Sequence, residues 1–144
     1  MSIFPSVVEN IANHAKSTPD KLALADSKQA LTYDQLWRCI YGLSQKFEEL
    51  GVGFEKCAVV ECNQSVDYMI CDLAIQVLGG IFVPLEKNVA TARAVEITTD
   101  TEAVLYVSKA PLEAELPAGI KPAFWDIDEC ALHPWEGDIP DLKF

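Results

Sequence analysis

The residues of this sequence best suited to bind a metal or act as nucleophiles are its five cysteines and two histidines. The cysteines stand at positions 39, 57, 62, 71 and 130, and the histidines at 14 and 133. No two cysteines have the C-x-x-C spacing, and no histidine lies near a cysteine pair, as a zinc site requires. We therefore expect reduced, buried thiols that pack as small hydrophobic residues. We predict no metal ligand in this chain.

Motifs for phosphate binding or acyl transfer are also absent from the sequence. It contains no G-x-x-x-x-G-K-[ST], no G-x-G-x-x-G after a strand and no G-x-S-x-G. The pair Gly79-Gly80 stands between an expected helix and an expected strand, where it turns the chain and cannot cradle phosphates. The acidic pairs at 48–49 and at 126 and 128 are interpreted as solvated surface charges. The residues alone thus predict no catalytic group.

Two amphipathic helices and a β-hairpin are predicted in the first fifty residues. They are a helix at 4–16, strands at 21–25 and 29–31, and a helix that begins after Thr32. Pro19 lies in the segment that ends the first helix. Thr32 and Gln35 have the spacing of a capping box, and Gly51 is placed for a left-handed C-terminal cap on the second helix.

Strands and helices alternate in the rest of the chain. Short apolar stretches predict strands at 57–60, 81–83, 103–107 and 123–125, and helical periodicity predicts helices at 66–77 and 90–99. Pro84 is expected to end the second of these strands. Such alternation with short connections favours right-handed crossovers. The predicted fold is a three-layer α/β domain with a mainly parallel sheet, flanking helices and a small N-terminal hairpin.

A ligand of such a sheet is expected outside the carboxyl ends of its strands. The segments that follow the first three predicted buried strands are 61–63, 86–88 and 108–109. Lys87 and Lys109 are their only cations, so they are the candidate residues for an anionic ligand. The simpler interpretation of each is a solvated loop lysine.

Composition and charge exclude several classes of protein. The chain has 144 residues, of which 50% are hydrophobic and 23% charged, as in an ordinary globular domain. With 22 Asp and Glu against 11 Lys and Arg, the formal net charge is −11. Such a charge repels nucleic acids and anionic membranes. We find no signal peptide and no stretch of about 20 apolar residues, and we expect a cytoplasmic protein without a membrane span.

The C-terminal segment, 126–144, differs from the rest. It has two prolines, many acidic residues and no sustained period, which predicts an extended surface segment. A compact domain seldom ends in a long structureless tail. We therefore divide the chain into an α/β subdomain at 1–125 and a segment at 126–144, and expect the chain to continue in its natural context.

Several segments resemble the motifs of the adenylate-forming (AMP-binding) enzymes. Residues 31–36, LTYDQL, resemble the first core motif, L-[TS]-Y-x-E-L, with Gln35 in place of Glu. Residues 76–86, QVLGGIFVPLE, are similar to L-K-A-G-G-A-Y-V-P-L-D, with Val77-Leu78 in place of Lys-Ala. These departures indicate a divergent member of the family.

Further segments follow the family's order. Residues 18–24 look like the family's opening P-D-x-x-A-L stretch, and Arg93 with residues 100–104 like its R-I … D-[ST]-x-A helix and strand. Residues 138–144 resemble the lead-in to the family's phosphate-binding loop. Each motif alone is unspecific, but together they cover about 8–107 in the family's order.

The resemblance implies part of an enzyme that activates a carboxylic acid with Mg-ATP. The family forms an acyl-adenylate and pyrophosphate, and then transfers the acyl group to a thiol. We interpret the chain as the N-terminal subdomain of an acid–CoA ligase, whose whole enzyme needs Mg-ATP and coenzyme A. The loop, Arg and Lys motifs that bind ATP would follow residue 144. We therefore expect no turnover, catalytic residue or cofactor in this chain alone.

The expected partners are the remainder of the ligase chain and, in the whole enzyme, a carboxylic acid. An apolar face that the remainder covers would be exposed here and could cause self-association. Three alternatives stay open: a peptide-synthetase adenylation domain, a free-standing flavodoxin-like binding or interaction module, and a non-catalytic paralogue that serves as a scaffold.

Overall fold

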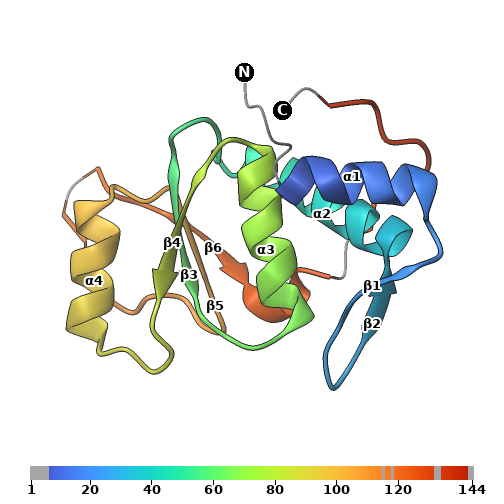
Figure 1. Ribbon diagram of the computed structural model, residues 1–144. Helices are drawn as coiled ribbons and strands as arrows, with labels where there is room; N and C mark the ends of the chain where they lie inside the picture. The colour runs from blue at the N-terminus through green and yellow to red at the C-terminus, as the bar shows by residue number, and fades with distance from the viewer. Residues whose placement is uncertain (1–6, 115, 118, 132–133, 143–144) are drawn as a thin grey trace.

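The fold, seen in a computed structural model, follows the predicted order of elements (Figure 1). The structure describes residues 7–114, 116–117, 119–131 and 134–142. The N-terminal elements are α1 (Val7–Ser17), β1 (Leu22–Ala25), β2 (Ala30–Thr32) and α2 (Tyr33–Glu49). They are followed by β3 (Cys57–Glu61), α3 (Val66–Val77), β4 (Ile81–Leu85), α4 (Thr91–Asp100), β5 (Leu105–Ser108), β6 (Ala123–Asp126) and the 3-10 helix η1 (Ile127–Glu129).

The central sheet has four strands in the order β4-β3-β5-β6. Every neighbouring pair in it is parallel, and the antiparallel pair β1-β2 forms a separate hairpin. Figure 1 shows α3 on one side of the sheet and α4 on the other, with α1 and α2 beyond α3. This arrangement confirms the predicted three-layer, parallel α/β fold with an N-terminal hairpin.

The caps of α2 lie where the sequence places them. The Thr32 hydroxyl accepts a hydrogen bond from the Gln35 amide at 3.2 Å, and the Gln35 side chain accepts one from the Thr32 amide at 2.9 Å. Two otherwise unpaired amides are thereby satisfied at the start of the helix. At its other end Gly51 has φ 103°, so the predicted capping box and left-handed residue are both confirmed.

Two expectations about β4 are wrong. Pro84 does not end the strand but lies within it, opposite Val60 of β3. A proline lacks the N–H that an interior strand needs, but β4 is an edge strand and pairs on one side only. The expected burial of this strand is not found either. Because β4 lies at the edge of the sheet, it is incompletely covered, and Ile81 is 46% exposed.

The structure differs from the predicted extended segment at residues 126–130. Asp126 is the last residue of β6, and η1 follows directly. Ile127 is 1% exposed and Cys130 is fully buried in the main core. The extended course begins later, and Figure 1 shows this last part of the chain returning beside α1 and α2. The division of the chain at residue 125 stays a prediction.

The C-terminal strap, residues 134–142, is held against α2 and α1. The Trp135 amide donates to the carbonyl of Arg38 at 2.9 Å, and the Arg38 guanidinium donates to the carbonyls of Trp135 and Gly137. Farther along, Lys16 of α1 forms an ion pair with Asp141. The strap is therefore packed against these helices, although it has no regular secondary structure.

Candidate functional site

The carboxyl ends of the four parallel strands meet at one edge of the sheet. An open pocket of about 380 Å³, here called the edge pocket, lies at these strand ends, against β3, β5 and the start of α4. Its polar lining includes Glu61 from the end of β3, Tyr106 and Ser108 from β5, and Asn88 from the loop before α4. The pocket thus occupies the position at which open α/β sheets hold ligands.

The two predicted candidate lysines are not brought together. Lys109 lines the pocket, and its ammonium lies 3.9 Å from an Asp128 carboxylate oxygen. Lys87 lies in the loop between β4 and α4, where it is exposed and is not part of the pocket lining. The structure therefore places the Lys109 ammonium at the pocket, with the Asp128 carboxylate close to it. A role of either lysine in ligand binding stays a prediction.

Tyr106 and Ser108 give the pocket its fixed polar groups. Both are buried, and the Ser108 hydroxyl donates to the carbonyl of Ala110 at 2.6 Å and accepts from the Ala110 amide at 3.1 Å. Burial and the Glu61 carboxylate raise the pKa of the Tyr106 hydroxyl, while a hydrogen bond with Ser108 opposes that shift. The phenol therefore stays protonated at neutral pH and serves as a hydrogen-bonding group.

Sequence reasoning named the segment 108–109 but missed Tyr106, which it took as one residue of an apolar strand. The available signal was the phenolic hydroxyl itself: Tyr106 stands two residues before a strand end, on the same side of the sheet as Ser108. A hydroxyl buried in such a place needs a polar partner. It therefore predicts a polar pocket close by.

Within the described residues, the thiols and His14 do not form a second site. The five cysteines are free, and Cys39, Cys71 and Cys130 are buried as expected, whereas Cys57 and Cys62 are half-buried. Burial raises the pKa of Cys39 to about 11, so that thiol is protonated at neutral pH. His14 stacks on Tyr33 with ring centroids 4.8 Å apart. His133 lies outside the described residues.

No group of His, Cys, Asp and Glu within the described part of the chain is arranged to hold a metal ion. Nor does any described helix have the length and apolarity that crossing a membrane requires. The edge pocket offers a phenol, a hydroxyl, an amide, the Glu61 carboxylate and one ammonium that lies close to a carboxylate. These groups can bind a polar ligand through hydrogen bonds, but they do not include an activated nucleophile.

A parallel sheet with helices on both faces, preceded by a hairpin, matches the N-terminal subdomains of adenylate-forming enzymes. The family comparison agrees. The family model described as AMP-binding enzyme matches residues 11–130, and the chain belongs to that family.

Among individual proteins, the chain is 32% identical to tyrocidine synthase 3 of Brevibacillus parabrevis over 95 residues, which are 66% of this chain and 2% of that protein. The inhibitor-bound N-terminal domain of FACL13 from Mycobacterium tuberculosis has the same fold, with a TM-score of 0.81, 16% identity and coverage of 98% of this chain and 38% of that one.

A third similar protein is the nonribosomal peptide synthetase FmoA3, solved in its α-methyl-L-serine-AMP-bound form. Its TM-score is 0.73 at 24% identity, and the match covers 89% of this chain and 15% of that one. The chain therefore spans only a small part of the proteins that it resembles.

Proposed function

We propose that this chain is the N-terminal subdomain of an ATP-dependent acid–thiol ligase. The whole enzyme would join a carboxylic acid to AMP, release pyrophosphate, and transfer the acyl group from the adenylate to a thiol. The observation that carries the proposal is the family match over residues 11–130. The order of the elements supports it, because the two motif segments lie where the sequence places them, at the start of α2 and from the end of α3 into β4.

The same proposal assigns the ATP chemistry to residues outside this chain. Phosphoryl charge in such a reaction must be offset by Mg²⁺, by cations and by backbone donors. The edge pocket has one lysine near it, already 3.9 Å from a carboxylate, and the described residues form no metal-binding group. Mg-ATP therefore does not fit the residues present here, and we expect no turnover by the 144-residue chain.

Coenzyme A is the first candidate for the acceptor thiol, as the motif pattern suggests. The second candidate is a carrier-protein thiol, with an amino acid as the substrate. The sequence identity of 32% to tyrocidine synthase 3 over 95 residues supports this second candidate. In either case we place the enzyme in the cytoplasm, where its thiol acceptor and its free cysteines stay reduced.

The partner expected first is the remainder of the same ligase chain. Several apolar side chains are open to solvent in the described part of the molecule, among them Phe54 at 78%, Leu22 at 62% and Val7 at 59% exposure. These exposed residues support the proposal of self-association in the isolated chain. Sedimentation at several concentrations tests it, and a monomer throughout would contradict it.

The proposed function is tested by comparing this chain with one extended along its own reading frame. Each protein is assayed for acid-dependent ATP–pyrophosphate exchange, with amino acids and with other carboxylic acids, and each is titrated calorimetrically with Mg-ATP and then coenzyme A. We expect exchange only in the extended protein. Thioester formation with free coenzyme A would support the first acceptor, and formation only on a carrier protein the second.

Two results would contradict the proposal. Tight nucleotide or flavin binding by the 144 residues alone would identify a self-sufficient binding module. A reading frame that continues into the family's catalytic motifs without exchange activity would identify a non-catalytic relative that keeps this subdomain as a scaffold.

A further inference from the structure

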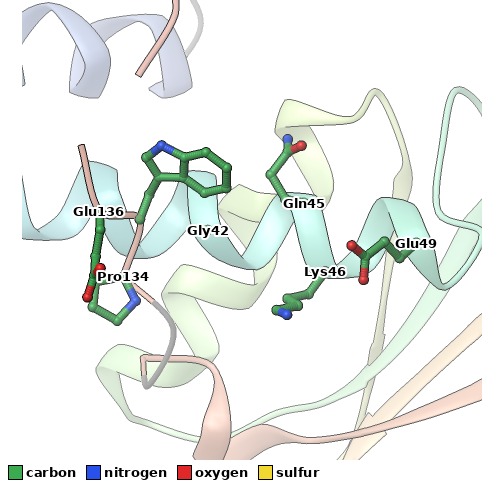
Figure 2. A pocket seen from close by; sticks show the side chains of 7 residues that line it. Gly42, Gln45, Lys46, Glu49, Pro134 and Glu136 are labelled. Carbon is green, nitrogen blue, oxygen red and sulfur yellow. The ribbon is translucent and has the colours of Figure 1, made fainter. Parts of the chain in front are cut away.

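A pocket beside Trp135 and the edge pocket differ in the charges that their walls present. The pocket beside Trp135 has a volume of about 660 Å³ and lies between α2 and the C-terminal strap. Figure 2 shows Lys46 and Glu49 projecting from α2, and Glu136 on the strap. These side chains are exposed and of both signs, so no single charge dominates that wall. The edge pocket, by contrast, has a half-buried carboxylate without a neighbouring cation.

This carboxylate is that of Glu61, the last residue of β3. Val59 of β3 pairs in register with Tyr106 of β5, and Glu61 follows two residues later, on the same face of the sheet. From the spacing of neighbouring strands and the rise per residue, the Cα atoms of Glu61 and Tyr106 lie about 8 Å apart, within reach of two long side chains. Consistent with this placement, burial first and the Glu61 carboxylate second raise the pKa of the Tyr106 hydroxyl. The carboxylate and the phenol therefore lie close together in the pocket wall.

The cations of the molecule leave the Glu61 charge uncompensated. Glu61 forms no ion pair with any residue that the structure describes. Lys109 is the cation of the pocket lining, but its side chain is 68% exposed and its ammonium lies 3.9 Å from Asp128, which is not part of that lining. A second carboxylate, that of Glu113, also lines the pocket. The charges of the edge pocket therefore favour a cationic ligand.

Apolar side chains complete the wall and limit the kind of cation that fits. Val89 comes from the loop before α4, Ala94 from the first turn of α4, and Leu112 from the segment after β5. Val89 and Leu112 also pack against the hydrophobic cluster between the sheet and α4. A hydrated metal ion gains nothing from such a surface, whereas an ammonium group on a small apolar body can bury that body against it.

We propose that the edge pocket binds a small primary amine whose ammonium group is attached to an apolar body. The ammonium donates to the Glu61 carboxylate and to the phenolic oxygen of Tyr106, and the apolar body lies against Val89, Ala94 and Leu112. An ammonium has three N–H donors, so these two acceptors leave one N–H for water at the open mouth of the pocket. Amine binding here does not depend on the proposed adenylation, and either can fail without the other.

Benzylamine, benzyl alcohol and benzoate are suitable probes, because they share one ring and differ in charge at pH 7. Each is titrated into the ¹⁵N-labelled 144-residue chain, and the backbone amides within 88–94 and 106–113 are followed by NMR. We expect saturable shifts with benzylamine and about fivefold weaker binding of benzyl alcohol, which keeps the shape without the charge. Benzoate should bind more weakly still. Equal binding of benzylamine and benzyl alcohol, tightest binding of benzoate, or no saturable shift with benzylamine would overturn the proposal.

Variants at the pocket locate the bound amine. Glu61→Gln keeps the shape of the side chain and should weaken benzylamine binding about fivefold while leaving benzyl alcohol unchanged. Glu48→Gln is the matched control, since it removes the same charge from an exposed position on α2. Tyr106→Phe, which removes only the hydroxyl, should weaken benzylamine about twofold, and Lys109→Gln, which removes the nearby cation, should tighten it about twofold. Equal losses in Glu61→Gln and Glu48→Gln, or no gain in Lys109→Gln, would show attraction to the acidic chain as a whole and refute the site.

Discussion

The two faces of the central sheet are covered to different extents. On the face toward α3, strand residues such as Val60, Leu105 and Val107 are fully buried against helix residues that include Ile70 and Phe47. The opposite face, toward α4, has a much smaller cluster, made of Val59, Leu85, Ala94, Ala103 and Tyr106. The sheet thus has one continuous core and one partial one.

The incompletely covered part of the α4 face lies at two of its margins. Phe124 of β6 pairs with Tyr106 in register, so it is on the α4 face, and it is 37% exposed. Ile81 lies two residues before Val83, which packs against the α4 cluster, and is 46% exposed. One helix cannot cover a four-stranded sheet. Stability should therefore depend on the α3 face, and the α4 face should tolerate change better.

The largest expected effect is a cavity made on the α3 face. Ile70 is fully buried, and Ile70→Ala should lower the free energy of unfolding by about 4 kcal/mol, since the surrounding helices cannot close the space. Leu85→Ala removes a fully buried side chain from the α4 cluster, and its nearby surface can relax inward, so a loss of about 2 kcal/mol is expected.

Urea unfolding followed by far-ultraviolet circular dichroism measures both losses. The comparison of the two variants is more informative than either value, because both delete an aliphatic side chain of the same size. Equal losses would mean that the α4 face is as tightly packed as the α3 face and would contradict the difference in covering between them.

A loss smaller than that of Ile70→Ala is expected where α3 turns into β4. A Cβ placed on Gly80 would lie 3.0 Å from the Ile75 side chain and 3.2 Å from the carbonyl oxygen of Lys56. Gly80→Ala should therefore cost about 2 kcal/mol through overpacking at this close approach. Gly53→Ala is the matched control, because nothing lies within 4 Å of a Cβ there. A loss in Gly53→Ala as large as that in Gly80→Ala would show that chain stiffness, and not space, limits the site.

The elements on which this comparison depends were largely predictable from local sequence. The Thr32 and Gln35 cap, the left-handed Gly51 and the period of α3 follow from interactions within a few residues. The parallel sheet followed from the alternation of strands and helices, because such crossovers have one favoured hand. Local sequence did not indicate that β4 would lie at the edge, so the place of Pro84 within a strand was missed.

The candidate sites were harder to predict for a related reason. The segment 108–109 was found because a parallel sheet collects its strand ends at one edge. The pocket beside Trp135 depends on a segment that returns to α2, with Arg38 and Trp135 separated by 97 positions in the chain. No periodicity marks such a return. Its only local sign was a run of prolines and acidic residues, which also fits an unstructured tail.

The polar contacts at the start of α3 join the hairpin to the well-covered face. Asp26, in the hairpin turn, accepts a hydrogen bond from the Val66 amide at 2.8 Å and others from the amides of Lys28 and Gln29. These bonds, that from Val66 foremost, lower the pKa of the Asp26 carboxyl below its ordinary value of 3.8. The charged form is thereby stabilised in the folded state.

Asp26→Asn should lower the melting temperature by about 3 °C at neutral pH, since an amide cannot accept on both sides. The contribution of Asp26 is present above pH 3.8 and is lost as the pH falls through the lowered pKa of the folded state. The difference between wild type and variant should therefore shrink below that pH. Asp20→Asn, the same charge change in the exposed turn before β1, is the control. A constant difference down to pH 2 would contradict this explanation.

The smallest effect, and the one of opposite sign, is expected at Asp67 in the first turn of α3. Its carboxylate accepts from the Ala131 amide at 2.9 Å and from the Gln29 side chain at 3.3 Å, yet burial raises its pKa. The folded state therefore holds this proton more tightly than the unfolded state, and the wild type loses stability as the pH rises from 3.8 through the raised pKa. Asp67→Asn keeps an acceptor for Ala131 and removes the half-buried charge. Its melting temperature should be about 1 °C above that of wild type at pH 7, beyond any gain in Asp20→Asn, and should lose that advantage at pH 3. A loss at pH 7 as large as that of Asp26→Asn would mean that the hydrogen bonds of the Asp67 carboxylate outweigh its partial burial, and that the α3 face tolerates a half-buried charge better than its apolar packing suggests.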